Sequence, residues 1–198
     1  MHGKDDSTSL FYSGNAATYA AALSDASLKR LDAFLAGLSA GATILELGCG
    51  SGRDSAVMIA RGFDVLPTDG ILEMASEASS RLSIPVPVLR FEDIDKVSAF
   101  DGIWANACLL HVPRSELGGI LQKIHTALRP GGVFYASFKA GETEGHDTFG
   151  RFFNYPSRDW LQLKYEALPW KSITMEEQSG SAYDRKPTEW LHVTAVKS

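Results

Sequence analysis

A glycine-rich turn between an apolar segment and a helical segment constrains the fold of this 198-residue chain more than any other feature. Residues 43–47 form an apolar run of strand length, and Gly48, Gly50 and Gly52 follow it directly, before a helical pattern begins. Glycine adopts backbone conformations closed to other residues and lets a ligand approach the main chain. The free N–H groups at the start of the helix attract polar or anionic ligand atoms. The pattern therefore predicts a ligand-binding turn between a strand and a helix.

A second apolar segment of strand length, residues 63–68, ends at Asp69. A carboxylate at this place beside a glycine turn can accept hydrogen bonds from both hydroxyls of a ribose. The alternative is a tight turn in which Asp69 only caps the next helix. Strand, glycine turn, helix, second strand and terminal acid together favour the binding of a nucleoside-containing cofactor.

Apolar segments of strand length alternate with helical patterns along the chain, which is typical of a mostly parallel sheet covered by helices. The predicted strands are 43–47, 63–68, 86–91, 100–105, 133–138, 170–176 and 190–196. The predicted helices are 15–23, 28–38, 53–61, 72–82, 113–128 and 157–165. The last two strands have no helix between them, which indicates an antiparallel hairpin at the sheet edge. We predict a doubly wound α/β fold with a mostly parallel seven-stranded sheet and an antiparallel C-terminal hairpin.

The composition limits the class of protein. Lys and Arg number 19 against 24 Asp and Glu, which gives a formal net charge of −5 and argues against a broad nucleic-acid surface. Two cysteines, Cys49 and Cys108, are too few for a disulfide-stapled secreted domain. The first residues lead into no apolar stretch, and no apolar run is long enough to span a bilayer. We therefore expect a soluble cytoplasmic protein of one domain, without membrane contact.

The spacing of the glycines distinguishes two kinds of nucleoside cofactor. Dinucleotide sites usually carry Gly-x-Gly-x-x-Gly, whereas this chain has Gly-x-Gly-x-Gly followed by Arg53. Glu46 stands just before the turn. A carboxylate there repels a pyrophosphate but suits a cofactor with positive charge. S-adenosylmethionine has such charge on its sulfonium and on its ammonium group, so the sequence favours it over a nicotinamide dinucleotide.

At these motifs the chain resembles the class I S-adenosylmethionine-dependent methyltransferases, which have a Rossmann-like fold. The segments that carry the resemblance are the first motif at 46–52, the second at 62–69, the adenine-contacting segment at 91–94, the fourth-strand motif at 100–105 and the turn at 128–132. The late hairpin agrees with the family's antiparallel seventh strand. Segments 109–113 and 150–154 resemble a bacterial group of small-molecule methyltransferases, some of which are named tellurite-resistance-like.

The resemblance implies that three segments of the single domain 1–198 have different roles. Residues 1–40 would form an N-terminal helical cap, 41–139 the cofactor-binding half, and 140–198 an acceptor-side loop with the C-terminal hairpin. The implied cofactor-binding residues are Glu46, Gly48, Gly50, Gly52 and Arg53 at the turn, Asp69 at the ribose, Gly70, Ile71, Glu92, Asp93 and Ile94 around the adenine, and Ala105 and Asn106 at the methionyl end. In comparable enzymes an N-terminal helix closes over the cofactor, which adds Tyr19.

Methyl transfer from a sulfonium is an in-line displacement, so the enzyme mainly aligns the acceptor and excludes water. A general base helps only where the acceptor must lose a proton. His111, shortly after the strand 100–105, is the leading candidate because an imidazole titrates near neutrality. The alternative is a histidine at a helix start that bonds only to the backbone. His192, on the last strand, is expected to be structural.

Candidates for the acceptor side lie in and after the polar loop 141–150. Arg151, Tyr155 and Arg158 follow it, and an arginine beside aromatic rings can hold a carboxylate or phosphate on the acceptor. The alternative is a loop anchored by phenylalanines, with the arginine in solvent. His146 lies within the loop and faces either the acceptor or solvent.

Several sequence features are also missing. The segment after 100–105 lacks the Asn/Asp-Pro-Pro pattern of the amino-methylating nucleic-acid enzymes, and no His, Cys and Asp cluster has metal-ligand spacing, so no metal site is expected. We expect an S-adenosylmethionine-dependent methyltransferase with a small-molecule acceptor. The alternatives are a nicotinamide-dependent oxidoreductase on a related fold and a non-catalytic S-adenosylmethionine-binding module.

Overall fold

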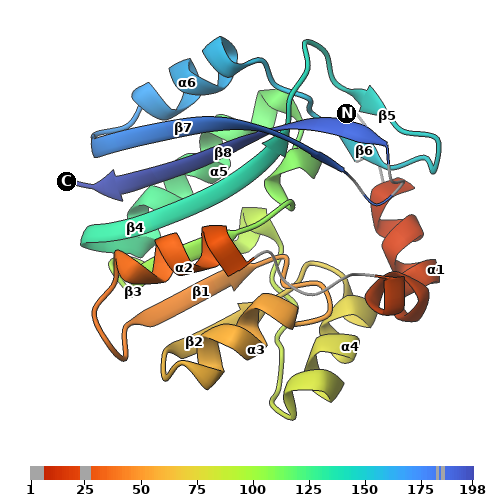
Figure 1. Ribbon diagram of the computed structural model, residues 1–198, viewed down its shortest axis with the longest axis horizontal. Coiled ribbons are helices and arrows are strands. Elements are labelled where there is room, and N and C mark those ends of the chain that lie inside the picture. Colours follow the sequence, from red (N-terminus) through yellow and green to blue (C-terminus); the bar gives the residue numbers. More distant parts are fainter. Residues whose placement is uncertain (1–6, 23–27, 182, 184–185) are drawn as a thin grey trace.

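Six strands form one sheet in the order β2-β1-β3-β4-β8-β7 in the computed structural model, which describes residues 7–22, 28–181, 183 and 186–198 (Figure 1). The strands are β1 (Thr43–Leu47), β2 (Asp64–Thr68), β3 (Phe100–Ala105), β4 (Leu128–Lys139), β7 (Trp170–Ser181) and β8 (Pro187–Lys197). Strands β1 to β4 pair in parallel, and β8 runs antiparallel to both of its neighbours. The predicted doubly wound sheet with a C-terminal antiparallel hairpin is confirmed.

One predicted strand does not form. Segment 86–91 touches the sheet only through an isolated bridge between Asp69 and Val88. Pro85 and Pro87 lie in or beside this segment, and proline has no N–H to donate to a ladder. The neighbouring strand β2 contains Pro67 and is likewise short of donors. The sheet therefore has six strands instead of seven, and β2 forms its edge.

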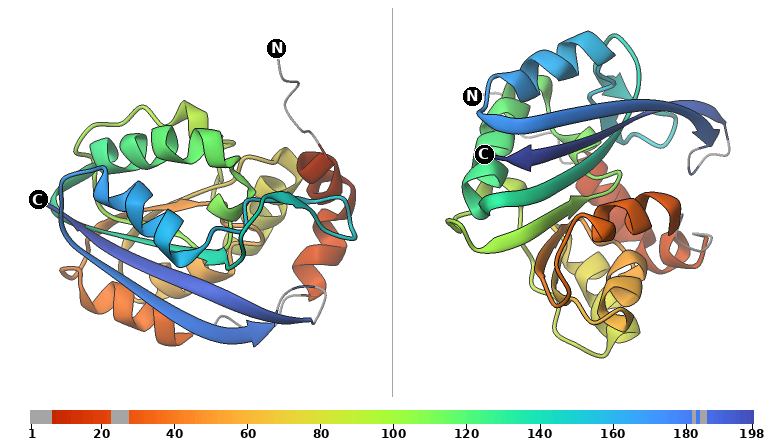
Figure 2. Two further views of the ribbon diagram at one scale, coloured as in Figure 1. Left: turned by 90° about the horizontal axis from the view of Figure 1, so that it is seen from above. Right: turned by 60° about the vertical axis from the view of Figure 1, so that its left-hand side comes forward.

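Alternate residues of the strands pack against helices on the two faces of the sheet (Figure 2). On one face, α2 (Leu28–Ala36) and α3 (Arg53–Ala60) cover side chains such as Ile44, Trp104 and Tyr135. On the other face, α5 (Arg114–Ala127) and α6 (Arg158–Glu166) cover the alternating set that includes Phe134 and Phe138. This two-sided burial explains why the central strands read as nearly continuous apolar runs.

The remaining elements gather at the carboxyl ends of the parallel strands. Helix α1 (Ser7–Ala22) lies beyond these ends (Figure 1), and it packs against α4 (Leu72–Leu82). It begins earlier than the helix predicted at 15–23, whose last residue is outside the described part of the chain. A small hairpin pairs β5 (Gly145–His146), in the polar loop 141–150, with β6 (Phe152–Phe153), just after that loop. In the part of the chain that the structure describes, no helix is both long and apolar enough to cross a membrane.

Candidate active site

The turn after β1 adopts a backbone that requires glycine. Gly48, Gly50 and Gly52 have φ values of +62°, +58° and +73°, in the left-handed region that other residues rarely adopt. Space imposes the same requirement at two of them. A Cβ at Gly48 would lie 2.5 Å from the Cβ of Cys108, and one at Gly52 would lie 2.9 Å from Cδ1 of Leu82.

Asp69 closes this turn from the end of β2. Its carboxylate accepts hydrogen bonds from the backbone N–H groups of Gly50 and Ile71, each at 2.9 Å. Burial raises the pKa of Asp69 to about 6, although the N–H groups of Ile71 and Gly50 act in the opposite direction. The acid therefore sits in a site that disfavours its charge until hydrogen-bond donors or a cation arrive.

A second buried acid stands on β1. Glu46 is 3% exposed and accepts a hydrogen bond from the hydroxyl of Ser55. Burial and the nearby Asp54 carboxylate raise the pKa of Glu46 well above its usual range. Since Glu46, Asp54 and Asp69 all line one cavity, this end of it attracts positive charge.

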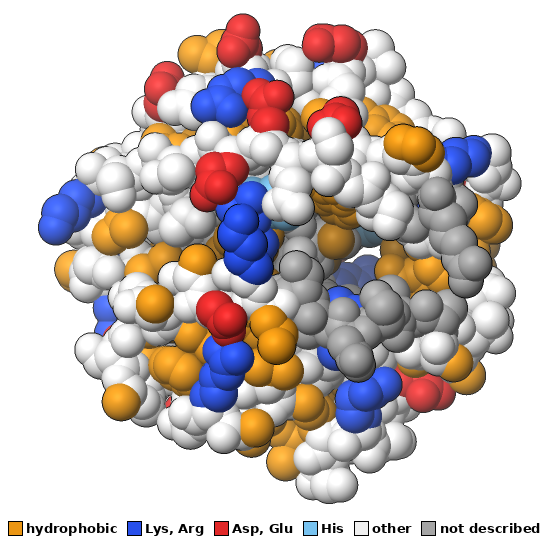
Figure 3. All heavy atoms as spheres, in the orientation of Figure 1, with side chains coloured by type: hydrophobic (Ala, Val, Ile, Leu, Met, Phe, Trp, Pro, Cys, Tyr) orange, Lys and Arg blue, Asp and Glu red, His pale blue; other side chains and the backbone are white. Residues whose placement is uncertain are grey.

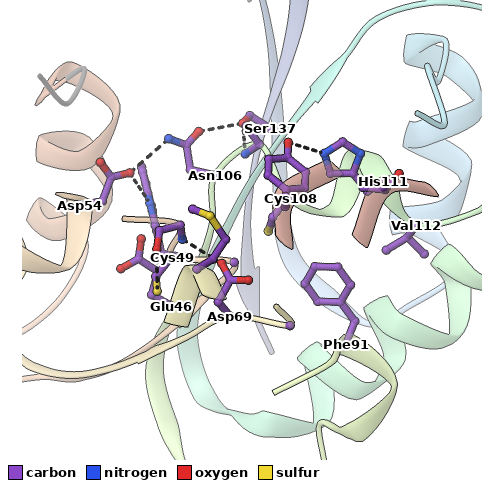
Figure 4. Close-up of a pocket in the computed structure, with 18 of the residues that line it drawn as sticks. Glu46, Cys49, Asp54, Asp69, Phe91, Asn106, Cys108, His111, Val112 and Ser137 are labelled. Atoms are coloured by element: carbon purple, nitrogen blue, oxygen red, sulfur yellow. Dashed lines mark hydrogen bonds between the residues drawn. The ribbon is translucent and has the colours of Figure 1, made fainter. Parts of the chain in front are cut away.

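Asp54, near the start of α3, orients the side chains at the end of β3. Its Oδ2 accepts hydrogen bonds from the indole N–H of Trp104 at 3.0 Å and from Nδ2 of Asn106 at 3.2 Å. The Oδ1 of Asn106 in turn accepts a hydrogen bond from the hydroxyl of Ser137 at 2.8 Å. Figure 4 shows Asn106 between Asp54 and Ser137. A buried acid thus fixes which way the Asn106 amide faces.

These residues form part of the wall of a cavity of about 930 Å³. The molecular surface is hollowed on the face shown in Figure 3. Ten of the residues expected to bind a cofactor line the cavity, namely Tyr19, Glu46, Gly48, Gly50, Arg53, Asp69, Gly70, Ile71, Glu92 and Asn106. Most of the residues that the sequence predicts to bind the cofactor therefore lie around one cavity.

The structure places four expected cofactor residues off the cavity wall. Gly52 packs against Leu82, and its role is to permit the turn. Ile94 and Ala105 are buried in the apolar core, and Asp93 is exposed on a short 3₁₀ helix. Their expected contacts with the adenine and the methionyl end find no support in this geometry.

His111 lines the cavity, but both of its ring nitrogens are already engaged. Its Nδ1 lies 2.6 Å from the carbonyl oxygen of Phe152, which can only accept, so Nδ1 carries the proton. Its Nε2 lies 3.1 Å from the Tyr12 hydroxyl and accepts that hydrogen bond. Burial lowers the pKa of His111 to about 4. The expected role of His111 as a direct base is not supported, because no lone pair is left for an acceptor molecule.

None of the four acceptor-side candidates lines the cavity. Arg151 is only 2% exposed, forms an ion pair with Asp147 at 2.7 Å, and is surrounded by aromatic rings. Arg158 pairs with Glu177 at 3.1 Å on the surface. Tyr155 stacks on a neighbouring phenylalanine, and His146 is exposed. The loop is therefore anchored by aromatic residues, as in the alternative reading, except that Arg151 is buried instead of solvated.

Part of the wall comes from residues that the sequence did not assign to a binding site. Tyr135 and Ser137 lie on β4, Trp190 and His192 on β8, and Arg30 on α2. His192, which is expected to be structural, also lines the cavity. One sequence signal points to them: the two residues on each strand are two positions apart. This spacing indicates only that their side chains share one face of the strand.

Comparisons with known proteins identify several methyltransferases that are similar to this chain. Residues 44–132 match the family described as a methyltransferase domain. Among curated proteins, YqeM of Bacillus subtilis (strain 168), which is named as a candidate methyltransferase, is 26% identical over 190 residues, 89% of this chain and 77% of that one.

Two solved structures share the fold. The 1,6-didemethyltoxoflavin N1-methyltransferase of Burkholderia thailandensis, with 1,6-didemethyltoxoflavin and S-adenosylhomocysteine bound, has a TM-score of 0.73 and 23% identity, covering 96% of this chain and 85% of that one. Phosphoethanolamine N-methyltransferase 2 of Haemonchus contortus has a TM-score of 0.75 and 16% identity, covering 94% and 59%. Residues 44–132 therefore match a methyltransferase domain, and the chain shares its fold with solved S-adenosylmethionine-dependent methyltransferases.

Proposed function

We propose that the cavity binds S-adenosylmethionine along the glycine turn and that the enzyme transfers its methyl group to a small-molecule acceptor. One observation carries the proposal: the buried carboxylate of Asp69 lines the cavity beside a turn of left-handed glycines. Two ribose hydroxyls donating to this carboxylate would supply the hydrogen bonds that its ionised form needs.

The charges of the wall fit the methionyl end of this cofactor. Glu46 and Asp54 lie on the same side of the cavity as Asn106, and a sulfonium and an ammonium group are both attracted by such acids. The same carboxylates would repel a pyrophosphate. The donor set therefore fits S-adenosylmethionine better than a nicotinamide dinucleotide.

The wall also offers a place for the adenine. Gly70 and Ile71 follow Asp69 directly, and Leu89 and Phe91 face the same part of the cavity from the segment beside β2. Apolar side chains next to exposed backbone suit a flat heteroaromatic ring with polar edges. Glu92 lines the cavity here as well and can accept a hydrogen bond from an exocyclic amine.

The size of the cavity suits two ligands at once. Small-molecule sites commonly span about 300–1,000 Å³, so about 930 Å³ leaves room for an acceptor beside the cofactor. When bound, S-adenosylmethionine supplies a methyl group that its sulfonium already activates. The residues of the chain then need only to orient the acceptor and exclude water, and Tyr12 and Tyr19 of α1 close the wall on one side.

A small acceptor is supported by the volume of the cavity and by the acidic balance of the chain. The similar enzyme from Burkholderia thailandensis was solved with 1,6-didemethyltoxoflavin, itself a small molecule. We extend the proposal to a cytoplasmic enzyme of the bacterial small-molecule group that includes tellurite-resistance-like members. We also propose that residues 1–198 act as one domain, because the wall draws on helix α1, the central strands and the C-terminal hairpin.

Calorimetry with S-adenosylhomocysteine tests the proposal. We expect binding of S-adenosylhomocysteine and none of NAD, and we expect Asp69→Ala to weaken the affinity about 10- to 100-fold, since hydrogen bonds to a charged group contribute ~1.5–3 kcal/mol. Asp95→Ala is the matched control, because Asp95 is exposed and lies off the cavity wall. Binding of NAD without S-adenosylhomocysteine would overturn the proposal, as would unchanged affinity in Asp69→Ala.

A further inference from the structure

Helix α2 places an arginine, Arg30, in the wall of the cavity, at the side formed by β7 and β8. Strand pairing sets Glu176 of β7 opposite His192 of β8, and it likewise sets Gln178 opposite Trp190. Nη1 of Arg30 lies 2.8 Å from a carboxylate oxygen of Glu176. Nη2 of Arg30 donates to Oε1 of Gln178 at 3.0 Å. The guanidinium therefore lies beside the hairpin of β7 and β8.

An acid of the cavity wall, Asp54, lies at a distance from this arginine. It accepts a hydrogen bond from the indole N–H of Trp104, whose ring stacks on Tyr135 with 4.0 Å between the centroids. The Tyr135 hydroxyl lies 2.8 Å from His192, beside which Arg30 lies. Three rings in succession therefore separate Asp54 from Arg30. An acid stands at the proposed methionyl end of the cavity, and a guanidinium stands at the hairpin end.

The hydrogen-bonding capacity of Arg30 is only partly used. Its side chain is 16% exposed, so water satisfies little of it. Its Nε is enclosed by protein atoms and has no hydrogen-bond partner among the described residues. A guanidinium has more N–H donors than the contacts with Glu176 and Gln178 use, and it has no acceptor. A largely buried guanidinium is stabilised best by an anion that accepts from two of its N–H groups at once.

The carboxylate that pairs with Arg30 can be replaced by another one. The Glu176 side chain is 57% exposed, and ion pairs with so exposed a member contribute little to stability. Arg151 differs, because its partner Asp147 is 10% exposed and also accepts hydrogen bonds from two backbone N–H groups. The carboxylate of a bound molecule can therefore take the place of Glu176 on Arg30, while Glu176 turns to water.

The neighbours of Arg30 suit a flat molecule with hydrogen-bond acceptors. Because arginine only donates, the Gln178 amide turns its oxygen to Arg30, and its NH2 group makes no hydrogen bond to another described residue. The rings of Trp190 and His192 are 25° from parallel, and Tyr135 continues this row at 24° from His192. All of these residues line the cavity. Aromatic side chains of this kind pack well against a planar ligand.

We propose that the methyl acceptor is a planar monocarboxylate and that Arg30 binds its carboxylate. The inference rests on the proposed function and names the substrate class of that site. One guanidinium balances one negative charge, which favours a monoanion over a phosphate dianion. With the carboxylate held at the hairpin, the opposite end of the acceptor faces the methionyl end of the cavity. The methylated atom is therefore not the carboxylate, and Arg30 determines specificity by orienting the acceptor.

Fluorine NMR with two matched probes tests the preference for charge. With S-adenosylhomocysteine bound, 4-fluorobenzoate and 4-fluorobenzamide have similar flat shapes and differ in charge. We expect the benzoate to bind about tenfold more tightly, the size expected for charge-assisted hydrogen bonds. Arg30→Gln should abolish the preference and leave the benzamide affinity unchanged. Arg61→Gln is the matched control, because it removes the same charge from an arginine that pairs with Asp32 off the cavity wall.

The substitution Glu176→Gln separates ligand binding by Arg30 from a purely structural role of the ion pair. It removes the carboxylate that competes for Arg30, so the benzoate should bind up to about fivefold more tightly while the benzamide affinity stays unchanged. The adjacent Glu177 provides the matched control, because it is also 57% exposed and pairs with Arg158 off the cavity wall. Glu177→Gln should leave both affinities unchanged.

Equal affinities for the two probes, a preference that survives Arg30→Gln, or weaker benzoate binding in Glu176→Gln would each overturn the inference. No binding of the benzoate at millimolar concentration would also overturn it. Tighter binding of 4-fluorophenyl phosphate than of the benzoate would overturn the assignment to a monocarboxylate. Failure of S-adenosylhomocysteine to bind would instead count against the proposed function. The two proposals therefore fail in separate measurements.

Discussion

The carboxylate of Asp69 accepts a hydrogen bond from the backbone N–H of Gly50 at 2.9 Å. The acid that we propose to hold the ribose therefore also holds the glycine turn against which the cofactor would lie. It does so in a buried position that raises its pKa to about 6, so the folded protein keeps a carboxylate where its charge is disfavoured. Such a conflict between stability and charge is common at functional sites.

Replacing Asp69 by Asn should stabilise the ligand-free protein. The folded pKa of Asp69 lies above its unfolded value, so at neutral pH the ionised group opposes folding. Asn removes the charge but keeps an oxygen for only one of the two N–H groups, because Gly50 donates to Oδ2 and Ile71 to Oδ1. We expect the lost charge to outweigh the lost hydrogen bond, so that the free energy of unfolding at pH 8 rises by roughly 1 kcal/mol. Urea denaturation measures this change. A loss of stability in Asp69→Asn would show that the carboxylate stabilises the turn more than its burial opposes it.

The affinity for S-adenosylhomocysteine should rise with pH through the titration of Asp69. Ribose hydroxyls donate to the ionised carboxylate, so the ligand binds the deprotonated protein better, and affinity should fall as the pH drops from 7 to 5. A decrease of up to about tenfold is expected, since the folded pKa is about 6. Calorimetry at several pH values measures it. The Asp69→Asn variant should bind weakly with little pH dependence over this range, and an equally steep dependence there would assign the titration to another group.

Acid should destabilise the protein through its buried neutral histidines. The pKa of His111 is lowered to about 4 by burial, so the unfolded chain binds a proton more readily below about pH 6.5. Its contribution to stability is therefore lost as the pH falls from about 6.5 to 4. Asp69 changes the stability with pH in the opposite direction. Its effect is the same in both proteins, so it cancels when the unaltered protein is compared with His111→Gln at each pH. The unfolding free energy of the variant should fall less steeply between pH 6.5 and 4.5, and parallel curves would contradict a buried neutral His111.

Two glycine substitutions should have opposite effects on stability. Gly52→Ala places a Cβ 2.9 Å from Leu82 on a backbone with φ of +73°, and we expect it to lower the unfolding free energy by about 1–3 kcal/mol. Gly119→Ala, in α5, meets open space and should raise it by roughly 0.5–1 kcal/mol. Thermal unfolding measures both. Equal changes in unfolding free energy for the two substitutions would contradict the strain expected at Gly52 and the gain in helix propensity expected at Gly119.

The parts of the site that sequence reasoning located are those encoded within one stretch of chain. Gly48, Gly50 and Asp69 could be placed because glycine spacing and a strand-ending acid are local signals with direct backbone meaning. The strand predicted at 86–91 failed for an equally local reason. Its apolar residues outweighed Pro85 and Pro87 in the prediction, while in the fold the missing N–H groups prevent a ladder.

The acceptor side was harder to predict because its residues come together through strand register. His192 faces the cavity only because β8 pairs with β4 so that Ser137 stands opposite it, and no spacing in the sequence encodes that pairing. Arg151 shows the converse error. An arginine among aromatic residues suggested an anion site, but Asp147, four residues earlier, satisfies its charge inside the loop.

The crystal structure of the protein with S-adenosylhomocysteine would test the central claim most directly. We predict electron density for the nucleoside in the cavity, with both ribose hydroxyls within 2.5–3.0 Å of the Asp69 carboxylate and the amino-acid end toward Asn106, as expected for charge-assisted hydrogen bonds. His192 would then face the remaining free space. A ribose bound away from Asp69, or a cavity that excludes the ligand at saturating concentration, would contradict the assignment of this pocket as the methyl-donor site.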